Sequence, residues 1–151
     1  MAINNKAILA LSKEDYRSAS LFLEEARLKH PHDPQSWYLS GVLFHKMGNL
    51  IQAREFLVKA VSICPDFYEA YNSLGCVYKD LGEFKNSEKA FSNAIQNSEG
   101  SAELYANRSD LFRQMKAFER AIRDCYLAIK MNNTLAAAHG NLAAIQIDLG
   151  A

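Results

Sequence analysis

Hydrophobic residues recur along the chain at the spacing of amphipathic helices, and polar residues fill the positions between them. Trp37 and Phe44 lie on one such stripe, and Ala53, Leu57 and Ala60 lie on the next. Residues spaced in this way share one face of an α-helix. A glycine separates the two stripes and a proline follows the second, as at the ends of helices. The pattern therefore predicts two consecutive antiparallel helices.

The same pattern returns every 34 residues. Gly41 and Gly75 are one period apart, and alanine stands at the same step at Ala26, Ala60, Ala94 and Ala128. A fixed period of this length is typical of helical repeat architectures. Small residues at these steps predict close crossings between paired helices, because larger side chains would hold the backbones apart.

The period predicts an all-α chain that forms one domain over residues 1–151. Its repeats are expected at about 1–33, 34–67, 68–101 and 102–135, followed by a half repeat at 136–151. The helices are expected near 34–47, 50–63, 68–81, 84–97, 102–115 and 118–131, with a degenerate pair at about 2–12 and 14–29 and a last helix at about 136–149. Asp33, Asp66 and Thr134 precede predicted helices and are expected to cap them.

Two segments resemble the tetratricopeptide repeat (TPR). They read Trp37-x-x-x-Gly41-x-x-Phe44 and Tyr71-x-x-Leu74-Gly75-x-x-Tyr78, and each is followed by the repeat's small residues. The resemblance implies a right-handed solenoid in which the first helix of each pair lines a concave groove. It also implies a scaffold that binds a peptide or helix of a protein partner, whose identity the sequence does not give.

The repeat family implies that the second, fifth, sixth, ninth and twelfth positions of each repeat face the groove. Glu69 and Glu103 occupy the second position. The candidate groove residues are Tyr38, Leu39, Val42, Asn72, Ser73, Lys79, Asn107, Asp110, Arg113 and Asn141. The first three form an apolar patch that either mediates self-association or is covered by the N-terminal helix.

Asn107 and Asn141 occupy the same position in successive repeats, and both are expected to be exposed. Together with the string from His139 to Ala143, they resemble part of the asparagine ladder in the repeat domain of O-GlcNAc transferases. An amide can donate to and accept from a peptide backbone at the same time. The resemblance implies a second possible role, as a substrate-recruiting arm of a larger enzyme such as a glycosyltransferase.

Composition narrows the function classes further. The chain has 17 Lys and Arg against 17 Asp and Glu, so it lacks the basic excess of a general nucleic-acid binder. No apolar run is long enough to insert into a membrane. Its three cysteines share no metal-ligand spacing, which favours reduced thiols and a cytoplasmic location.

No motif indicates a catalytic, cofactor or metal site, and we expect no enzymatic activity. His30-Pro31-His32-Asp33 is expected to be a turn, and Cys125 a small core residue. Cys76 is the cysteine expected to face the groove. The last predicted helix has little polarity on its outer face, where Leu142, Ala143 and Leu149 stand. This face predicts self-association, or a chain cut from a longer array.

Overall fold

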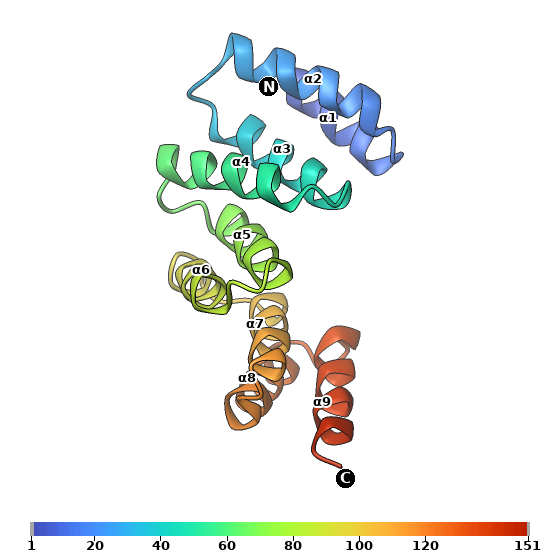
Figure 1. The fold of residues 1–151 in the computed structure, drawn as a ribbon, viewed down its shortest axis with the longest axis vertical. Helices are drawn as coiled ribbons and strands as arrows, with labels where there is room; N and C mark the ends of the chain where they lie inside the picture. The colour runs from blue at the N-terminus through green and yellow to red at the C-terminus, as the bar shows by residue number, and fades with distance from the viewer. Residues whose placement is uncertain (1, 151) are drawn as a thin grey trace.

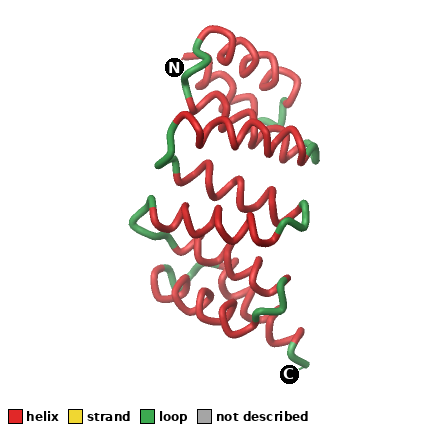
Figure 2. The backbone as a smooth tube through the Cα atoms, turned by 60° about the vertical axis from the view of Figure 1, so that its left-hand side comes forward, coloured by secondary structure: helices red, strands yellow, loops and turns green. Residues whose placement is uncertain are grey.

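The computed structural model describes residues 2–150, and all regular structure in that range is helical (Figures 1 and 2). In chain order the helices are α1 (Ala2–Ser12), α2 (Tyr16–Lys29), α3 (Pro34–Lys46), α4 (Leu50–Ile63), α5 (Tyr68–Asp80), α6 (Phe84–Gln96), α7 (Ala102–Gln114), α8 (Phe118–Met131) and α9 (Ala136–Asp148). The predicted helices are confirmed to within about two residues.

The helices form antiparallel pairs that stack from α1 and α2 at one end to α9 at the other (Figure 1). Each first helix also contacts the first helix of the next pair, so that α1, α3, α5, α7 and α9 form a continuous row. The second helices α2, α4, α6 and α8 do not contact one another. The stack therefore curves with the first helices on its inner face, which we call the concave face.

Glycines permit the close crossing of paired helices. A Cβ atom added to Gly75 would lie 2.7 Å from the ring of Phe91 on the partner helix, and one added to Gly41 would overlap Leu57. Ala60 is fully buried. The expectation that small residues set these crossings is confirmed.

One of the three predicted caps is correct. The Asp33 carboxylate accepts a 3.1 Å hydrogen bond from the amide of Gln35 at the start of α3. Asp66 instead accepts from the thiol of Cys64, and Thr134 donates to Asn132 within the same turn. Both residues lie one position too early, because α5 and α9 begin after Phe67 and Leu135, which have no capping side chain.

The first helix of each pair ends in a left-handed residue. Gly48, Gly82 and Gly150 have φ angles of 79°, 77° and 74°, and Lys116 and Glu14 have 59° and 57° at the same place in their repeats. Left-handed backbone is unfavourable for residues with a Cβ atom. The Glu14 turn also delays the start of α2, which begins at Tyr16 and not at residue 14.

Candidate functional site

The ten candidate groove residues all lie on first helices, which the fold places along the concave face. Three are on α3, three on α5, three on α7 and one on α9. They are therefore brought onto one side of the molecule, although several of them are occupied in ways that the sequence pattern does not reveal.

The apolar end of the groove is partly closed. Leu39 is only 6% exposed, because it packs in one hydrophobic cluster with Ala7 and Ala10 of α1. The alternative in which the N-terminal helix covers this residue is therefore correct, and an open position for Leu39 is wrong. Tyr38 and Val42 remain half-buried. Tyr38 packs against Phe67 with a ring separation of 5.0 Å, and burial raises the pKa of its hydroxyl.

The two groove asparagines are not free side chains. Asn107 donates to Oδ1 of Asn72 at 3.0 Å, and Asn141 donates to the carbonyl of Ala106 at 2.8 Å. Each bond spans 35 residues and joins one first helix to the preceding one. The expectation that both residues are exposed is wrong, because this offset directs each amide across the helix boundary.

Most charges on the concave face are also paired between repeats. His45 lies 2.7 Å from Asp80, and Arg113 of α7 lies 2.9 Å from Asp148 of α9. Lys79 of α5 lies 2.7 Å from Asp110 of α7. Arg113 also lies 3.3 Å from Asp110. The candidate residues Lys79 and Arg113 therefore both form ion pairs with the candidate residue Asp110.

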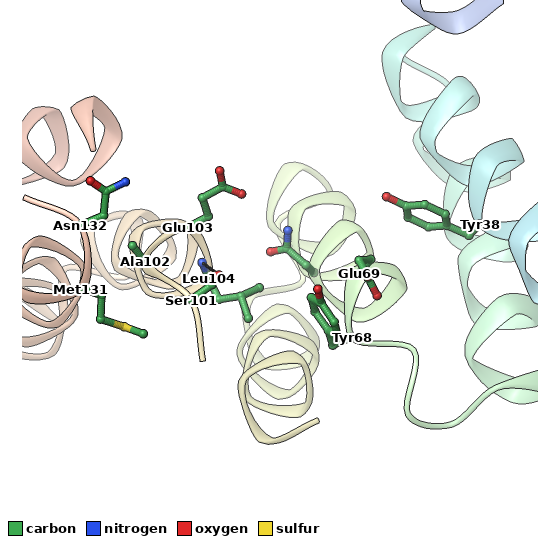
Figure 3. A pocket seen from close by; sticks show the side chains of 10 residues that line it. Tyr38, Tyr68, Glu69, Ser101, Ala102, Glu103, Leu104, Met131 and Asn132 are labelled. Carbon is green, nitrogen blue, oxygen red and sulfur yellow. Dashed lines mark hydrogen bonds between the residues drawn. The ribbon is translucent and has the colours of Figure 1, made fainter. Parts of the chain in front are cut away.

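A cleft of about 630 Å³ opens on the concave face beside the beginnings of α5 and α7. Figure 3 shows Glu69 and Glu103 projecting from these two helices, with Tyr38 on the far side of Glu69. Neither glutamate forms an ion pair among residues 2–150. A side-chain hydrogen bond with Glu69 raises the pKa of Tyr68 at the rim. The full lining is Tyr38, Tyr68, Glu69, Asn72, Ser101, Ala102, Glu103, Leu104, Met131 and Asn132.

Several of these lining residues could not be found from the groove positions of the repeat. Ser101, Met131 and Asn132 belong to the turns between pairs and to the end of α8, which the groove pattern leaves out. The available signal was the 34-residue step between Glu69 and Glu103, which puts two carboxylates in equivalent places on neighbouring first helices.

The cysteines are consistent with their predicted places. Cys125 is fully buried, with its sulfur 2.9 Å from the hydroxyl of Ser109. Cys76 is half-buried on α5, and burial raises the pKa of its thiol.

His30-Pro31-His32-Asp33 forms the turn between α2 and α3. Among residues 2–150, no three His, Cys, Asp or Glu side chains lie close enough together to hold a metal ion.

A family model described as anaphase promoting complex subunit 8 / Cdc23 matches residues 2–129. The chain belongs to this family. The resemblance to the TPR is confirmed, and so is the all-α solenoid. None of the helices in the described part of the chain is long and apolar enough to cross a membrane.

Individual proteins show the same relationship. Human tetratricopeptide repeat protein 7A is 24% identical over 121 residues, which cover 80% of this chain and 14% of that protein. The anaphase-promoting complex subunit CDC16 of Saccharomyces cerevisiae (strain ATCC 204508 / S288c) is 25% identical over 117 residues, which cover 72% of this chain and 14% of CDC16. The chain thus spans about a seventh of the length of these relatives.

A solved structure extends the likeness to the fold. The crystal structure of the APC/C hetero-tetramer Cut9-Hcn1 contains a chain that superposes with a TM-score of 0.90 at 13% identity. The match covers 95% of this chain and 29% of the other. Family membership and repeat architecture together support a protein-interaction role.

Proposed function

We propose that the chain is a scaffold segment that binds an extended stretch of a partner protein along its concave face, with a basic side chain of that partner in the cleft between α5 and α7. The observation that carries the proposal is the pair Glu69 and Glu103, whose carboxylates face this cleft without a cation from the described part of the chain. A carboxylate that lines a cleft binds most strongly to a charged donor.

The surrounding charges favour the same ligand. Lys79 on α5 and Arg113 on α7 are cations of the two helices that form the cleft, and both are already bonded to Asp110. An acidic partner segment would therefore meet Glu69 and Glu103 with no cation available to offset them. Tyr38 adds an aromatic face beside the cleft, against which the aliphatic stem of a lysine or arginine can pack.

Apart from Leu39, which is buried against α1, the candidate residues divide into two groups. Tyr38 and Asn72 line the cleft and can contact the partner, and Oδ1 of Asn72 also accepts from Asn107. Ser73 and Val42 lie on the same face. Asn107, Asp110, Arg113, Asn141 and Lys79 bond between repeats and position the first helices relative to one another.

A second candidate function is assembly into a larger complex through α9. Of the three residues expected on its outer face, Ala143 is exposed and Leu149 is 53% exposed, whereas Leu142 packs against the core cluster of Phe112 and Ile145. Ile147 on the same helix is 74% exposed. Apolar faces of this kind mark contacts with other chains. A subunit of the same complex as CDC16, or a second copy of this chain, would cover these side chains.

Other expectations from the sequence stay predictions. The matched family is that of a complex subunit, so it adds nothing to the alternative of a glycosyltransferase arm. The absence of enzymatic activity and of a cofactor, the cytoplasmic location and the division into repeats at 33, 67, 101 and 135 likewise await a test.

Selection from a random peptide library tests the proposed groove. We expect peptides selected on the 151-residue chain to be enriched in Lys or Arg, and to be lost when selection is repeated on the double variant Glu69→Gln, Glu103→Gln. Glu24→Gln, Glu119→Gln is the matched control, because both residues are exposed on second helices. Selected peptides that lack basic residues, or that bind the Glu69→Gln, Glu103→Gln variant as well as the unaltered chain, would refute the proposal.

A further inference from the structure

A second cleft, of about 600 Å³, lies at the opposite end of the stack between α1 and the beginning of α3. Its lining consists of Asn4, Asn5, Ile8, His30, Asp33 and Gln35. The lining contains no lysine or arginine, and apart from the aliphatic Ile8 every side chain in it can accept a hydrogen bond in at least one form. His30 and Asp33 belong to the turn between α2 and α3, which thus forms part of the cleft wall.

Asn4, which lines this cleft, has one side-chain atom without a hydrogen-bond partner. The residue is 6% exposed, and its Nδ2 donates a 2.7 Å hydrogen bond to Oδ2 of Asp33. Its Oδ1 is buried and accepts no hydrogen bond. The bond to Asp33 fixes the orientation of the Asn4 amide, because a reversed amide would place Oδ1 of Asn4 against Oδ2 of Asp33. A buried acceptor without a partner is unusual in native proteins and calls for an explanation.

The repeat explains why the chain does not supply that donor itself. Asn72 stands two periods after Asn4, and its Oδ1 accepts from Asn107, which lies 35 residues further on. The residue 35 positions after Asn4 is Leu39, which has no donor and is buried against α1. The acceptor of Asn4 is therefore left for a group from outside the chain.

The charge beside Asn4 selects the kind of donor. The carboxylate of Asp33 forms no ion pair among residues 2–150, and it caps α3 through the amide of Gln35. A helix N-terminus contributes roughly half a positive charge. Asp33 therefore leaves the cleft net negative, which repels a carboxylate ligand and attracts a cation.

We propose that this cleft binds the side-chain ammonium of a lysine from a partner polypeptide. The three donors of an ammonium group match the carboxylate of Asp33, Oδ1 of Asn4 and the amide oxygen of Gln35. Ile8, which is 44% exposed, packs against the aliphatic stem of the lysine. Because Oδ1 of Asn4 is buried, binding at this atom requires a small displacement of the terminal helix α1, which contacts only α2 and α3.

The inference rests on the proposed function and adds a second contact for the same bound segment. Asp33 and Gln35 stand two periods before Ser101 and Glu103, which line the cleft between α5 and α7. The two clefts therefore lie at equivalent places along the row of first helices, where one extended basic segment can reach both.

Amide chemical shifts of the isotopically labelled 151-residue chain test this site. The probe is the capped pentapeptide Gly-Gly-Lys-Gly-Gly, compared with the same peptide acetylated on the lysine Nε. We expect saturable shifts at residues 4–8 and 30–36 with the free lysine, and an affinity lower by about tenfold or more after acetylation, which removes the charge. Equal shifts with both peptides would overturn the proposal.

Two variants separate recognition from structure. Asp33→Asn keeps a good capping residue but removes the charge, and Asn4→Ala removes the free acceptor; both should weaken lysine binding by about fivefold to tenfold. Asp15→Asn is the matched control, because Asp15 caps α2 through Ser18 outside the cleft. Unchanged affinity in Asp33→Asn and Asn4→Ala, with melting temperatures confirming the fold, would show a purely structural role.

The same titration distinguishes the two proposals. Shifts confined to the cleft between α5 and α7, and abolished by Glu103→Gln, would overturn the inference and leave the proposed function standing. Shifts at neither cleft, with the lysine pentapeptide or with a peptide from the library selection, would overturn both.

Discussion

The side chain of Asn107 donates a 3.0 Å hydrogen bond to Oδ1 of Asn72 and so joins α7 to α5 across the concave face. Asn141 makes the equivalent connection from α9 to the backbone of Ala106. These amides occupy positions at which the repeat pattern alone suggests ligand contacts. In this chain they hold successive repeats together, whereas Glu69 and Glu103 form no ion pair among residues 2–150 and are the groups that we propose bind a partner.

Removing the amide of Asn107 should therefore lower stability. We expect Asn107→Ala to reduce the free energy of unfolding by about 1 kcal/mol, because the hydrogen bond is lost and Asn72 loses its donor. Urea denaturation measures the change. The control is Asn5→Ala, an exposed site on α1 where the change should stay within about 0.5 kcal/mol. Equal stabilities of the two variants would show that the bond between repeats contributes nothing.

The crossing of α5 and α6 should not tolerate a larger residue at Gly75. Gly75→Ala places a methyl group 2.7 Å from the ring of Phe91, and overpacking of this kind costs about 1–3 kcal/mol. Gly140→Ala on α9 is the control: no atom lies within 4 Å of its added Cβ, and alanine favours the helix by about 1 kcal/mol. Thermal unfolding should shift in opposite directions for the two variants, and a shift in the same direction would contradict the packing argument.

The left-handed turn at Lys116 should be improved by glycine. Its φ of 59° matches that of Gly82 one repeat earlier, but a left-handed residue with a Cβ atom costs about 1–2 kcal/mol. Because glycine also gains entropy in the unfolded chain, Lys116→Gly should stabilise the protein by about 0.5–1 kcal/mol. Gly82→Ala should destabilise it. Melting temperatures unchanged in both variants would show that the left-handed backbone at this turn costs no stability.

Acid should weaken the contact between α5 and α7. Burial pushes the pKa of Asp110 upward, but the hydrogen bond and charge of Lys79, followed by those of Arg113, outweigh it and lower the pKa below its ordinary value of 3.8. A carboxyl whose pKa is lower in the folded state stabilises the fold above its unfolded pKa, and this stability is lost as pH falls through the folded value.

The variant Asp110→Asn isolates this effect. Between about pH 6 and pH 3, the variant should lose less stability than the wild type, because it no longer has the carboxylate that becomes protonated. Glu119→Gln, at an exposed site that has no ion pair within residues 2–150, should follow the wild-type curve. Parallel curves for Asp110→Asn and wild type would show that the Lys79 pair does not couple folding to pH.

The sequence predicts those features of the fold that depend on residues close together in the chain, and it predicts less well those that depend on contacts between separate repeats. The 34-residue period predicts the helices and their crossings, because Gly41 and Gly75 each contact a residue of the other helix in their own pair. The cap at Asp33 follows from local chemistry, whereas Asp66 and Thr134 lie one residue before the N-cap positions of α5 and α9. The burial of Leu39 depends on how α1 packs against α3, which a repeat consensus does not describe for a terminal helix.

The candidate site was less predictable for the same reason. The 35-residue hydrogen bonds of Asn107 and Asn141 depend on the offset between neighbouring first helices, and hydrophobic periodicity does not encode this offset. Met131 and Asn132 reach the cleft from the end of α8, outside any groove position. The equivalence of Glu69 and Glu103 was visible in the sequence, but their freedom from ion pairs follows only from the positions of Lys79 and Arg113.

Calorimetric titration with a basic peptide from the library selection tests the central claim most directly. The wild-type chain and the control Glu24→Gln, Glu119→Gln should bind the peptide with equal affinity, and Glu69→Gln, Glu103→Gln should bind it at least about tenfold more weakly, since both cleft carboxylates are lost. Equal affinity for all three proteins would place the partner elsewhere and contradict recognition of a basic segment by the concave face.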